Sequence, residues 1–458
     1  MASTSSIDAA LAFAPDAATL EHAIAEIAAD GDASGSAVDA ATRREALALY
    51  ATLPMAQGNP SRGWRYNYAK LPMDGLDWSS GRASVATIPF GVADAVDPDV
   101  DQPALATENA GGIVHLGSTL LEPRDAKHDP RITICSLADA QRDHAALLAG
   151  VQHEIAAWRK DKFAALSTAF QNCGAFVYVP AGVVLDAPIQ LLFVGSEAEP
   201  AAVFPHVVVV LGAGARASIL ERFSGDGDTF VGAIVEVQLG DNAQLDYVAV
   251  QRAGEEARVM SYRAARIGHD ATMRFHVADL GGALVRTVLD NDLASTGARA
   301  EVAALFFTGG TQHVDLTTGT LHAVGPTTSN TVVRSAATDQ GQGRFFGNIQ
   351  ILPKAHGSDA SLRDDALLLS KRAHIDSVPA LEIAANDVKA FHGATVGSVD
   401  EEQLFYARSR GIARADALRM IALGFFEPVI SRFPGERLRD EIRTALDAKI
   451  DEATEIDA

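Results

Sequence analysis

The sequence predicts a mainly β protein whose centre is a parallel β-helix and whose two ends are helical. A glycine recurs every 28 or 29 residues through the centre of the chain, at Gly212, Gly240, Gly268, Gly297 and Gly325. The runs between these glycines alternate apolar and other residues with the period of two that strands show. Both ends are instead rich in Ala, Leu and Glu, which favour helices. A regular period of this length indicates stacked repeats, with a β-sandwich of coincidental spacing as the alternative.

Residues 1–170 are expected to form a helical and mixed N-terminal domain. The stretches 20–29 and 40–53 lack glycine and proline and favour helices. Asp39 is expected to be the N-cap of the second of them, because its carboxylate can accept hydrogen bonds from the free N–H groups of the first turn. The stretch 138–168 predicts one further, longer helix.

Residues 171–398 are expected to form the β-helix. Each repeat carries an apolar or β-branched residue, a glycine, two variable residues and an alanine, as in Leu239-Gly-Asp-Asn-Ala243. Glycine suits a turn that needs a positive φ, and a small alanine fits a crowded corner. We therefore expect the first four repeat glycines to occupy equivalent turns of successive repeats, with neighbouring strands about 4.8 Å apart.

Residues 399–458 are expected to form a helical C-terminal domain. Asp400 is a capping residue before the first helix, and Gly411 suits the C-terminal end of that helix. Apolar residues at helical spacing over 418–430 predict a second helix, and a charged third helix follows over 436–455. The apolar stripe of the second helix is expected to cover the end of the β-helix.

Charge and cysteine content narrow the class of protein. A net charge of -21 disfavours binding to nucleic acid or to an anionic membrane surface. The two cysteines, Cys135 and Cys173, are too few for a disulfide framework and cannot alone supply four thiolates to a metal cluster. The sequence shows no signal-peptide pattern and no apolar run of the roughly 18 residues that a membrane span needs. These features predict a cytoplasmic protein in a reducing compartment.

Familiar catalytic motifs are absent from the sequence, which lacks a Walker A loop, a nucleophile elbow, a His-Glu-x-x-His motif and a Cys-x-x-Cys pair. Two polar stretches remain as candidate sites. His392, within 386–395, is either a turn or core residue or a metal ligand, and one histidine needs further groups to hold iron. His313, Asp315 and His322 form the second stretch, but the nine-residue spacing of the two histidines fits neither a helical nor a strand pair.

A series of motifs follows in close order in the last third of the chain, over about 355–430. These motifs are Leu367-Leu-Leu-Ser370, Leu381-Glu-Ile383, Asp387-Val-Lys389, His392-Gly-Ala-Thr-Val-Gly397 and Asp400-Glu-Glu-Gln-Leu-Phe-Tyr406. This run resembles the hallmark of the SufB/SufD family of iron–sulfur cluster assembly scaffold proteins. A weaker resemblance extends to Trp64-Arg-Tyr66, to Gly174-Ala-Phe-Val-Tyr-Val-Pro180 and to 315–329.

The resemblance implies a right-handed parallel β-helix and a scaffold role without enzymatic activity. It implies a complex with a SufB-like paralogue and a SufC-like ABC-type ATPase, the latter docked on 399–458, with a homodimer as the assembly of the isolated chain. An iron–sulfur cluster would be held transiently and shared with the SufB-like partner. His392 matches the SufD histidine at that interface, which makes it the candidate iron or cluster ligand. The sequence His392-Gly-Ala-Thr-Val-Gly397, which contains no cysteine, indicates the SufD branch.

Departures from the family pattern leave alternatives open. Ala390 stands where SufD proteins often have a cysteine, and Leu362, Asp364 and Ala366 replace a glutamine and two asparagines. A purely structural SufD-like protein is therefore one alternative. A stand-alone β-helical carbohydrate-active enzyme is another, although neither a secretion signal nor a carboxylate cluster along one strand face is evident. Family complexes are linked to reduced flavin, for which the sequence carries no motif.

Overall fold

The computed structural model describes residues 38–54, 109–121, 129–195, 201–225 and 227–456, together with the single residues 22 and 25. The helix predicted over 20–29 and the Trp64-Arg-Tyr66 motif lie outside this part of the chain.

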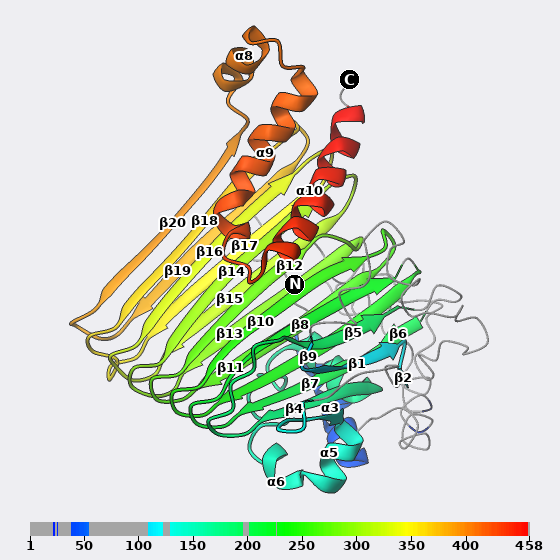
Figure 1. The fold of residues 1–458 in the computed structure, drawn as a ribbon, viewed down its shortest axis with the longest axis vertical. Coiled ribbons are helices and arrows are strands. Elements are labelled where there is room, and N and C mark those ends of the chain that lie inside the picture. Colours follow the sequence, from blue (N-terminus) through cyan, green and yellow to red (C-terminus); the bar gives the residue numbers. More distant parts are fainter. Residues whose placement is uncertain are drawn as a thin grey trace, which may run out of the picture.

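The described residues form a parallel β-solenoid of about eight turns, with helices toward both ends of the chain (Figure 1). Successive strands alternate between two sheets, so that most turns contribute one strand to each. The first sheet contains β2 (Thr119–Leu121), β1 (Gly111–Leu116), β5 (Ile189–Val194), β8 (Arg216–Gly225), β10 (Gln244–Ala253), β12 (Thr272–Asp279), β14 (Arg299–Thr308), β16 (Thr328–Ala337), β18 (Asp359–Leu368) and β20 (Lys389–Ser398). The second contains β19 (His374–Ile383), β17 (Gln342–Ile351), β15 (His313–His322), β13 (Leu284–Leu293), β11 (Arg258–Ile267), β9 (Thr229–Leu239), β7 (Pro205–Leu211), β4 (Cys173–Val179) and β3 (Thr133–Ser136), with β6 (Ala201–Val203) beside β9.

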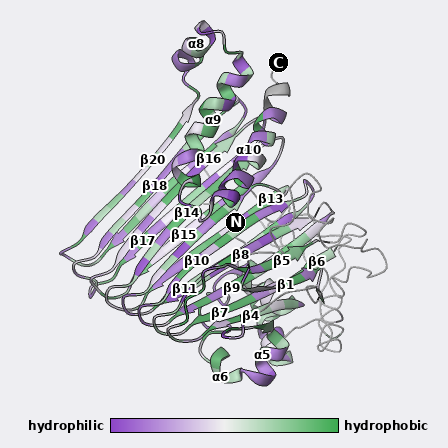
Figure 2. Ribbon diagram, in the orientation of Figure 1, coloured by the Kyte–Doolittle hydropathy of each residue, from purple (hydrophilic) through white to green (hydrophobic). Residues whose placement is uncertain are grey.

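The pairing register sets the length of each turn. Arg258 lies opposite Leu284, 26 residues on, whereas Gln342 lies opposite His374, 32 residues on. Inward-facing apolar residues from both sheets form one continuous core along the solenoid, to which Val235, Val237 and Leu239 belong. Figure 2 shows the alternation of hydropathy along the strands as green and purple bands. The predicted fold class is confirmed.

The repeat glycines hold equivalent positions in three turns but not in the fourth. The N–H groups of Gly240 and Gly268 donate to the residue that ends the strand of the preceding turn, at 2.8 and 3.1 Å, and Gly212 does the same. The prediction for Gly297 is wrong, because that turn is one residue longer and Ser295 takes the glycine position: Ala298 N–H donates to Ser295 O as Ala271 N–H donates to Gly268 O. Gly297 lies instead beside Asp270 of the preceding turn.

The two glycine requirements in these corners are distinct. Gly297 and its equivalents Asn242 and Asp270 have φ values of 77°, 59° and 52°, so this position needs a left-handed backbone. At Gly240 the requirement is space, because a Cβ atom there would lie 2.9 Å from the backbone nitrogen of Ala213. The glycine that recurs at Gly240 and its equivalents is therefore required by the close approach of stacked turns, and not by a positive φ.

The N-terminal helices pack on the outer face of the second sheet. α3 (Ala40–Thr52) is capped by Asp39, whose carboxylate accepts from the N–H groups of Ala41 and Thr42 at 2.8 and 2.9 Å, as predicted. It packs on α7 (Lys162–Phe170), and the buried Arg43 guanidinium donates to the carbonyl of Ala169 at 2.8 Å. The apolar residues under these helices include Phe204, Phe230 and Ile234.

The single helix predicted over 138–168 is wrong. The chain instead forms α5 (Leu137–Asp143) and α6 (Ala145–Leu148) and then a series of turns before α7 begins. Gly150 and His153 have positive φ values, 76° and 62°, which no right-handed helix contains. Although the composition of this segment favours a helix, its packing against the outer face of the second sheet determines its conformation.

The C-terminal helices are α8 (Glu401–Ser409), α9 (Arg414–Ile430) and α10 (Glu436–Ile456). Asp400 accepts from Glu402 N–H at 2.9 Å and Gly411 has a φ of 88°, so both predicted end signals are confirmed. Among the described residues, no helix has the length and apolar content to cross a membrane.

α9 and α10 lie over the outer face of the first sheet, not over the end of the solenoid (Figure 1). Their apolar residues, among them Phe426 and Ile442, pack against alternate residues of β14, such as Leu305 and Phe307. The expectation that the apolar stripe of the second helix covers the end is therefore wrong. The helices bury their apolar residues against the outer sheet face instead, and the edges of β19 and β20 stay uncovered in the described part of the chain.

A substitution at Gly240 tests the role of close approach. Gly240→Ala is expected to destabilise the protein by about 1–3 kcal/mol, because the added methyl group meets backbone rather than a movable side chain. The measurement is the urea midpoint of the full chain. Gly397→Ala is the control, since nothing lies within 4 Å of its added Cβ. Equal midpoints for the two variants would contradict this account of the repeat.

Candidate functional site

The last turn of the solenoid carries the histidine that the sequence singled out. His392 lies in β20 opposite Leu362 of β18, and Ala390 lies opposite Ala360. Leu362 and Ala360 belong to the interior core. Because aligned residues of parallel strands point to the same face, His392 is on the interior side of its turn. It is nevertheless exposed, since none of the described residues forms a further turn on β20.

One turn below His392, the interior contains an ionisable group that is fully buried. Asp364 of β18 has no hydrogen-bond partner within 3.5 Å for either carboxylate oxygen, and it faces the Ser377 hydroxyl of β19. Burial is the main reason that the pKa of Asp364 is raised to about 7. The open end therefore presents an imidazole at its surface and a weakly acidic carboxyl group below it.

The edges around His392 are suited to association. In the part of the chain that the structure describes, β19 and β20 are the terminal strands of their sheets, and each leaves one row of backbone N–H and C=O groups without a ladder partner. Phe391, Val396 and Ile383 are exposed there, Phe391 by 57%. An open apolar edge of this kind is a template for another chain.

A second exposed apolar patch lies on the C-terminal helices. Phe405 and Tyr406 of α8 are 74% and 61% exposed, and Met420 of α9 is exposed as well. α8 projects beyond the solenoid in Figure 1, and only Leu404 of this helix is buried. These side chains add nothing to the core, so their apolar character indicates a contact surface.

The second stretch that the sequence singled out is not one site. His313 begins β15 and His322 ends it, which places them about 30 Å apart along the strand. The ring nitrogens of His322 lie 2.7 and 2.9 Å from the hydroxyls of Thr327 and Ser329, and Asp315 forms an ion pair with Arg344. His322 and Asp315 thus have structural partners in neighbouring turns and strands.

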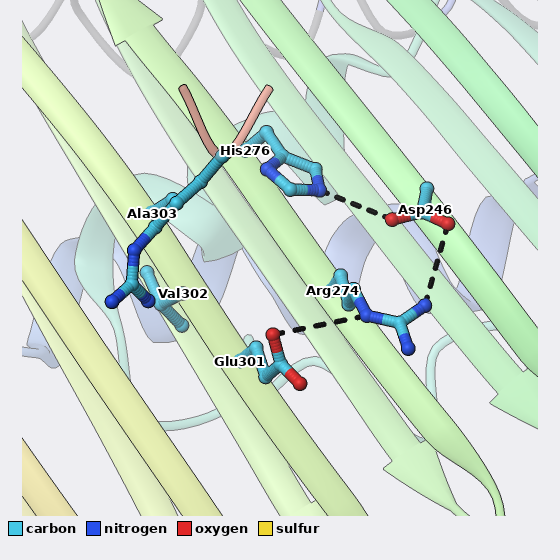
Figure 3. Close-up of a pocket in the computed structure, with 7 residues that line it drawn as sticks. Asp246, Arg274, His276, Glu301, Val302 and Ala303 are labelled. Carbon is cyan, nitrogen blue, oxygen red and sulfur yellow. Dashed lines mark hydrogen bonds and ion pairs between the residues drawn. The ribbon is translucent and has the colours of Figure 1, made fainter. Parts of the chain in front are cut away.

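A pocket of about 380 Å³ lies on the outer face of the first sheet, beside Arg432 (Figure 3). Asp246 lies 3.2 Å from the ring of His276 and 3.4 Å from Arg274, which also pairs with Glu301 at 3.8 Å. The alternating charges of this row compensate one another across stacked strands. We assign the row a structural role.

Neither cysteine offers a thiolate. Both are free, Cys173 is buried and Cys135 partly so. Burial raises the pKa of Cys135 to about 11 and raises that of Cys173 as well, so both thiols stay protonated at neutral pH.

Sequence reasoning missed a cluster of metal-ligand type among the described residues, formed by His153, His206 and Glu236. These residues are far apart in the sequence, and His153 lies in a segment predicted to be helical. The register of the 28-residue repeat, which brings His206 next to Ile234 and so near Glu236, was the one signal that could have found part of it.

The fold and its end define a β-solenoid with an open edge that carries exposed apolar residues. Comparisons give the family. Residues 193–425 match the model described as SUF system FeS cluster assembly, SufBD core domain, and residues 119–191 match the SufBD protein N-terminal region. The chain belongs to the SufBD family.

Curated relatives carry the same family name. An iron–sulfur cluster assembly SufBD family protein of Mycobacterium leprae is 31% identical over 265 residues, which is 57% of this chain and 30% of the relative. A SufBD family protein of Staphylococcus saprophyticus and the iron–sulfur cluster assembly protein SufB of Bacillus subtilis are each 28% identical, over 60% of both chains. The matched region thus spans less than two thirds of these relatives.

The buried carboxyl group predicts a pH dependence of stability. Asp364 stays protonated in the folded protein up to about pH 7, whereas an unfolded aspartate ionises near pH 4. Ionisation of Asp364 therefore does not reduce the free energy of unfolding below pH 4. Between pH 4 and 7 it lowers that free energy by at most about 1.4 kcal/mol per pH unit. Asp364→Asn is expected to raise the melting temperature at pH 8 and to leave it unchanged at pH 4.

The control for this prediction is Asp387→Asn, at an exposed aspartate near the same end. It is expected to leave the melting temperature unchanged at both pH values. A gain for Asp364→Asn that is the same at pH 4 and pH 8 would show that ionisation of this group does not limit stability.

Proposed function

We propose that this chain is a SufD-type scaffold subunit, without catalytic activity of its own, of a cytoplasmic complex that assembles iron–sulfur clusters. The observation that carries the proposal is the open last turn, where His392 lies on the interior side of an uncovered, apolar edge. Membership of the SufBD family supports the link to cluster assembly. The absence of cysteine from β20 supports the SufD branch over the SufB branch.

The open end is proposed to bind a SufB-like paralogue. A second solenoid of the same family would bring its own terminal strands, and pairing would satisfy the free backbone groups of β19 and β20. It would also bury Phe391, Val396 and Ile383. A homodimer through the same end is the assembly expected when the paralogue is absent.

His392 is proposed to be this subunit's ligand to iron or to the nascent cluster, which is the cargo of the complex. The thiols of Cys135 and Cys173 are protonated and lie in other parts of the fold. An imidazole at the interface binds iron only together with groups from the partner, because a single nitrogen ligand does not hold a cluster. The cluster would therefore be shared and transient.

The C-terminal helices are proposed to bind the SufC-like ATPase. α9 and α10 are fixed to the sheet by their buried apolar faces, whereas α8 presents Phe405 and Tyr406 to solvent. Two exposed aromatic side chains on a projecting helix are the kind of anchor that dominates binding at protein interfaces. This surface lies on α8, which follows β20 in the chain, and not on the strands that form the open end.

Replacing His392 separates a ligand role from a structural one. His392→Ala is expected to fold, to co-purify with the paralogue and the ATPase, and to fail to support cluster assembly in cells that lack the wild-type gene. Lys389→Ala, at another exposed residue of β20, is the matched control and should complement fully. Complementation by His392→Ala would favour the purely structural alternative. Loss of the paralogue from the complex would instead give His392 a role in association.

Replacing the aromatic pair of α8 tests the ATPase surface. The double variant Phe405→Ser, Tyr406→Ser is expected to lower affinity for the ATPase at least about tenfold, because hot-spot aromatics each contribute about 1–2 kcal/mol or more. Isothermal titration with the purified ATPase gives the constant, and the melting temperature should not change. Val184→Ser, at an exposed apolar residue elsewhere, should bind normally. Unchanged affinity of the double variant would remove α8 from the interface.

A further inference from the structure

A buried polar cluster lies on the outer face of the second sheet, far from the open end. Glu236 of β9 is fully buried, and its carboxylate accepts from the backbone N–H groups of His153, Ile155 and Ala156 at 2.5, 2.8 and 2.8 Å. These bonds fasten the turns between α6 and α7 to the solenoid. The ligand atoms of Glu236, His153 and His206 all lie within 4.8 Å of one another.

His206 of β7 is oriented like a metal-binding imidazole. Its Nδ1 lies 3.1 Å from the side-chain oxygen of Gln171, and its Nε2 lies 2.9 Å from Glu236 Oε2. A neutral ring carries one N–H, and here both nitrogens face oxygen. If Nδ1–H donates to Gln171, the Nε2 lone pair points at a carboxylate, an arrangement that a cation between the two atoms satisfies. Metal-bound histidines are held in this way by a hydrogen bond on the other ring nitrogen.

His153 supplies the independent observation. Both of its ring nitrogens are buried and have no hydrogen-bond partner among the residues that the structure describes, and its ring lies 4.8 Å from that of His206 between centroids. Its backbone is fully used, since the N–H donates to Glu236 and the carbonyl accepts from Trp158 Nε1 at 3.0 Å. An imidazole buried without a partner costs free energy, and a ligand at this point would remove the cost.

We propose that His153, His206 and Glu236 bind one divalent first-row transition-metal ion, of the Zn²⁺ or Fe²⁺ type. Two imidazoles and one carboxylate are a donor set that such ions take, and they leave a tetrahedral position for water. Coordination at about 2.0–2.2 Å places ligand atoms about 3.3 Å apart. Binding therefore requires the ligand atoms, now within 4.8 Å of one another, to adjust, and the 2.9 Å contact between His206 and Glu236 to open slightly. The ion would clamp the α6–α7 segment onto the solenoid. The inference is independent of the proposed function.

The test uses the full chain, freed of metal with EDTA and dialysed. Titration with ZnCl₂ is expected to show one tight site per chain, and CoCl₂ to give the visible absorption of a four-coordinate ion. His153→Phe keeps the ring shape and removes both nitrogens, and it should weaken this site at least about 100-fold. His269→Phe is the matched control, because this exposed histidine forms an ion pair with Asp270 and should not contribute.

Thermal unfolding provides a second readout. Without metal, His153→Phe should melt no lower than the wild type, since the imidazole has no hydrogen bond to lose and its buried nitrogens are removed. Zinc at 100 times its Kd should raise the wild-type melting temperature by about 3 °C and leave that of His153→Phe unchanged. Absence of a stoichiometric site in the wild type, or equal binding by His153→Phe, would overturn the proposal. Binding that is lost in His269→Phe but kept in His153→Phe would show an adventitious ion only and would also overturn the proposal.

Discussion

Each turn of this solenoid is stable because the turn on either side satisfies its backbone and covers its apolar interior. Because the parallel strands pair in register, every turn has the same face inward. The residues at the corners must also have small side chains, since the backbones of neighbouring turns approach closely there. Gly240 and its equivalents meet that demand by having no Cβ, and alanines such as Ala243 and Ala271 follow at the same corner. The rest of the structure depends on this stacking, because a turn without a neighbour has nothing to complete it.

The two ends of the stack are treated differently. At the beginning, β1–β2 and β3–β4 pair antiparallel, so the direction of the chain reverses and the parallel ladder stops. At the last turn the ladder simply ends on β19 and β20, and the C-terminal helices that could have covered it lie on the sheet face instead. In the described part of the chain, the open end is therefore the one place where a turn has a stacked neighbour on one side only.

The sequence predicted the features that follow from repetition and from local capping. A glycine period near 28, alternating strands and the capping residues Asp39 and Asp400 are local signals, and each has a direct physical cause. Gly297 was misplaced because a turn can gain one residue without losing its stack. The helix over 138–168 failed because packing on a sheet outweighs composition.

The candidate site was predictable only in part. His392 was found from a motif, but its position on the interior side of an open turn depends on the register with Leu362, which needs the fold. Asp364 became notable only through burial. The His153 cluster joins a turn segment to two strands across 83 residues, and no spacing rule connects such residues before the topology is known.

The stacking also fixes distances. From β9, which carries Glu236, to β19 at the open end there are five steps in the second sheet, or about 24 Å at the spacing of paired strands. A stack of hydrogen-bonded turns is stiff along its axis, so this separation does not close. An ion held by His153, His206 and Glu236 could not reach a cluster at His392. The solenoid would act as a spacer between the two sites. A change at one site would influence the other only through the stability of the stacked turns between them.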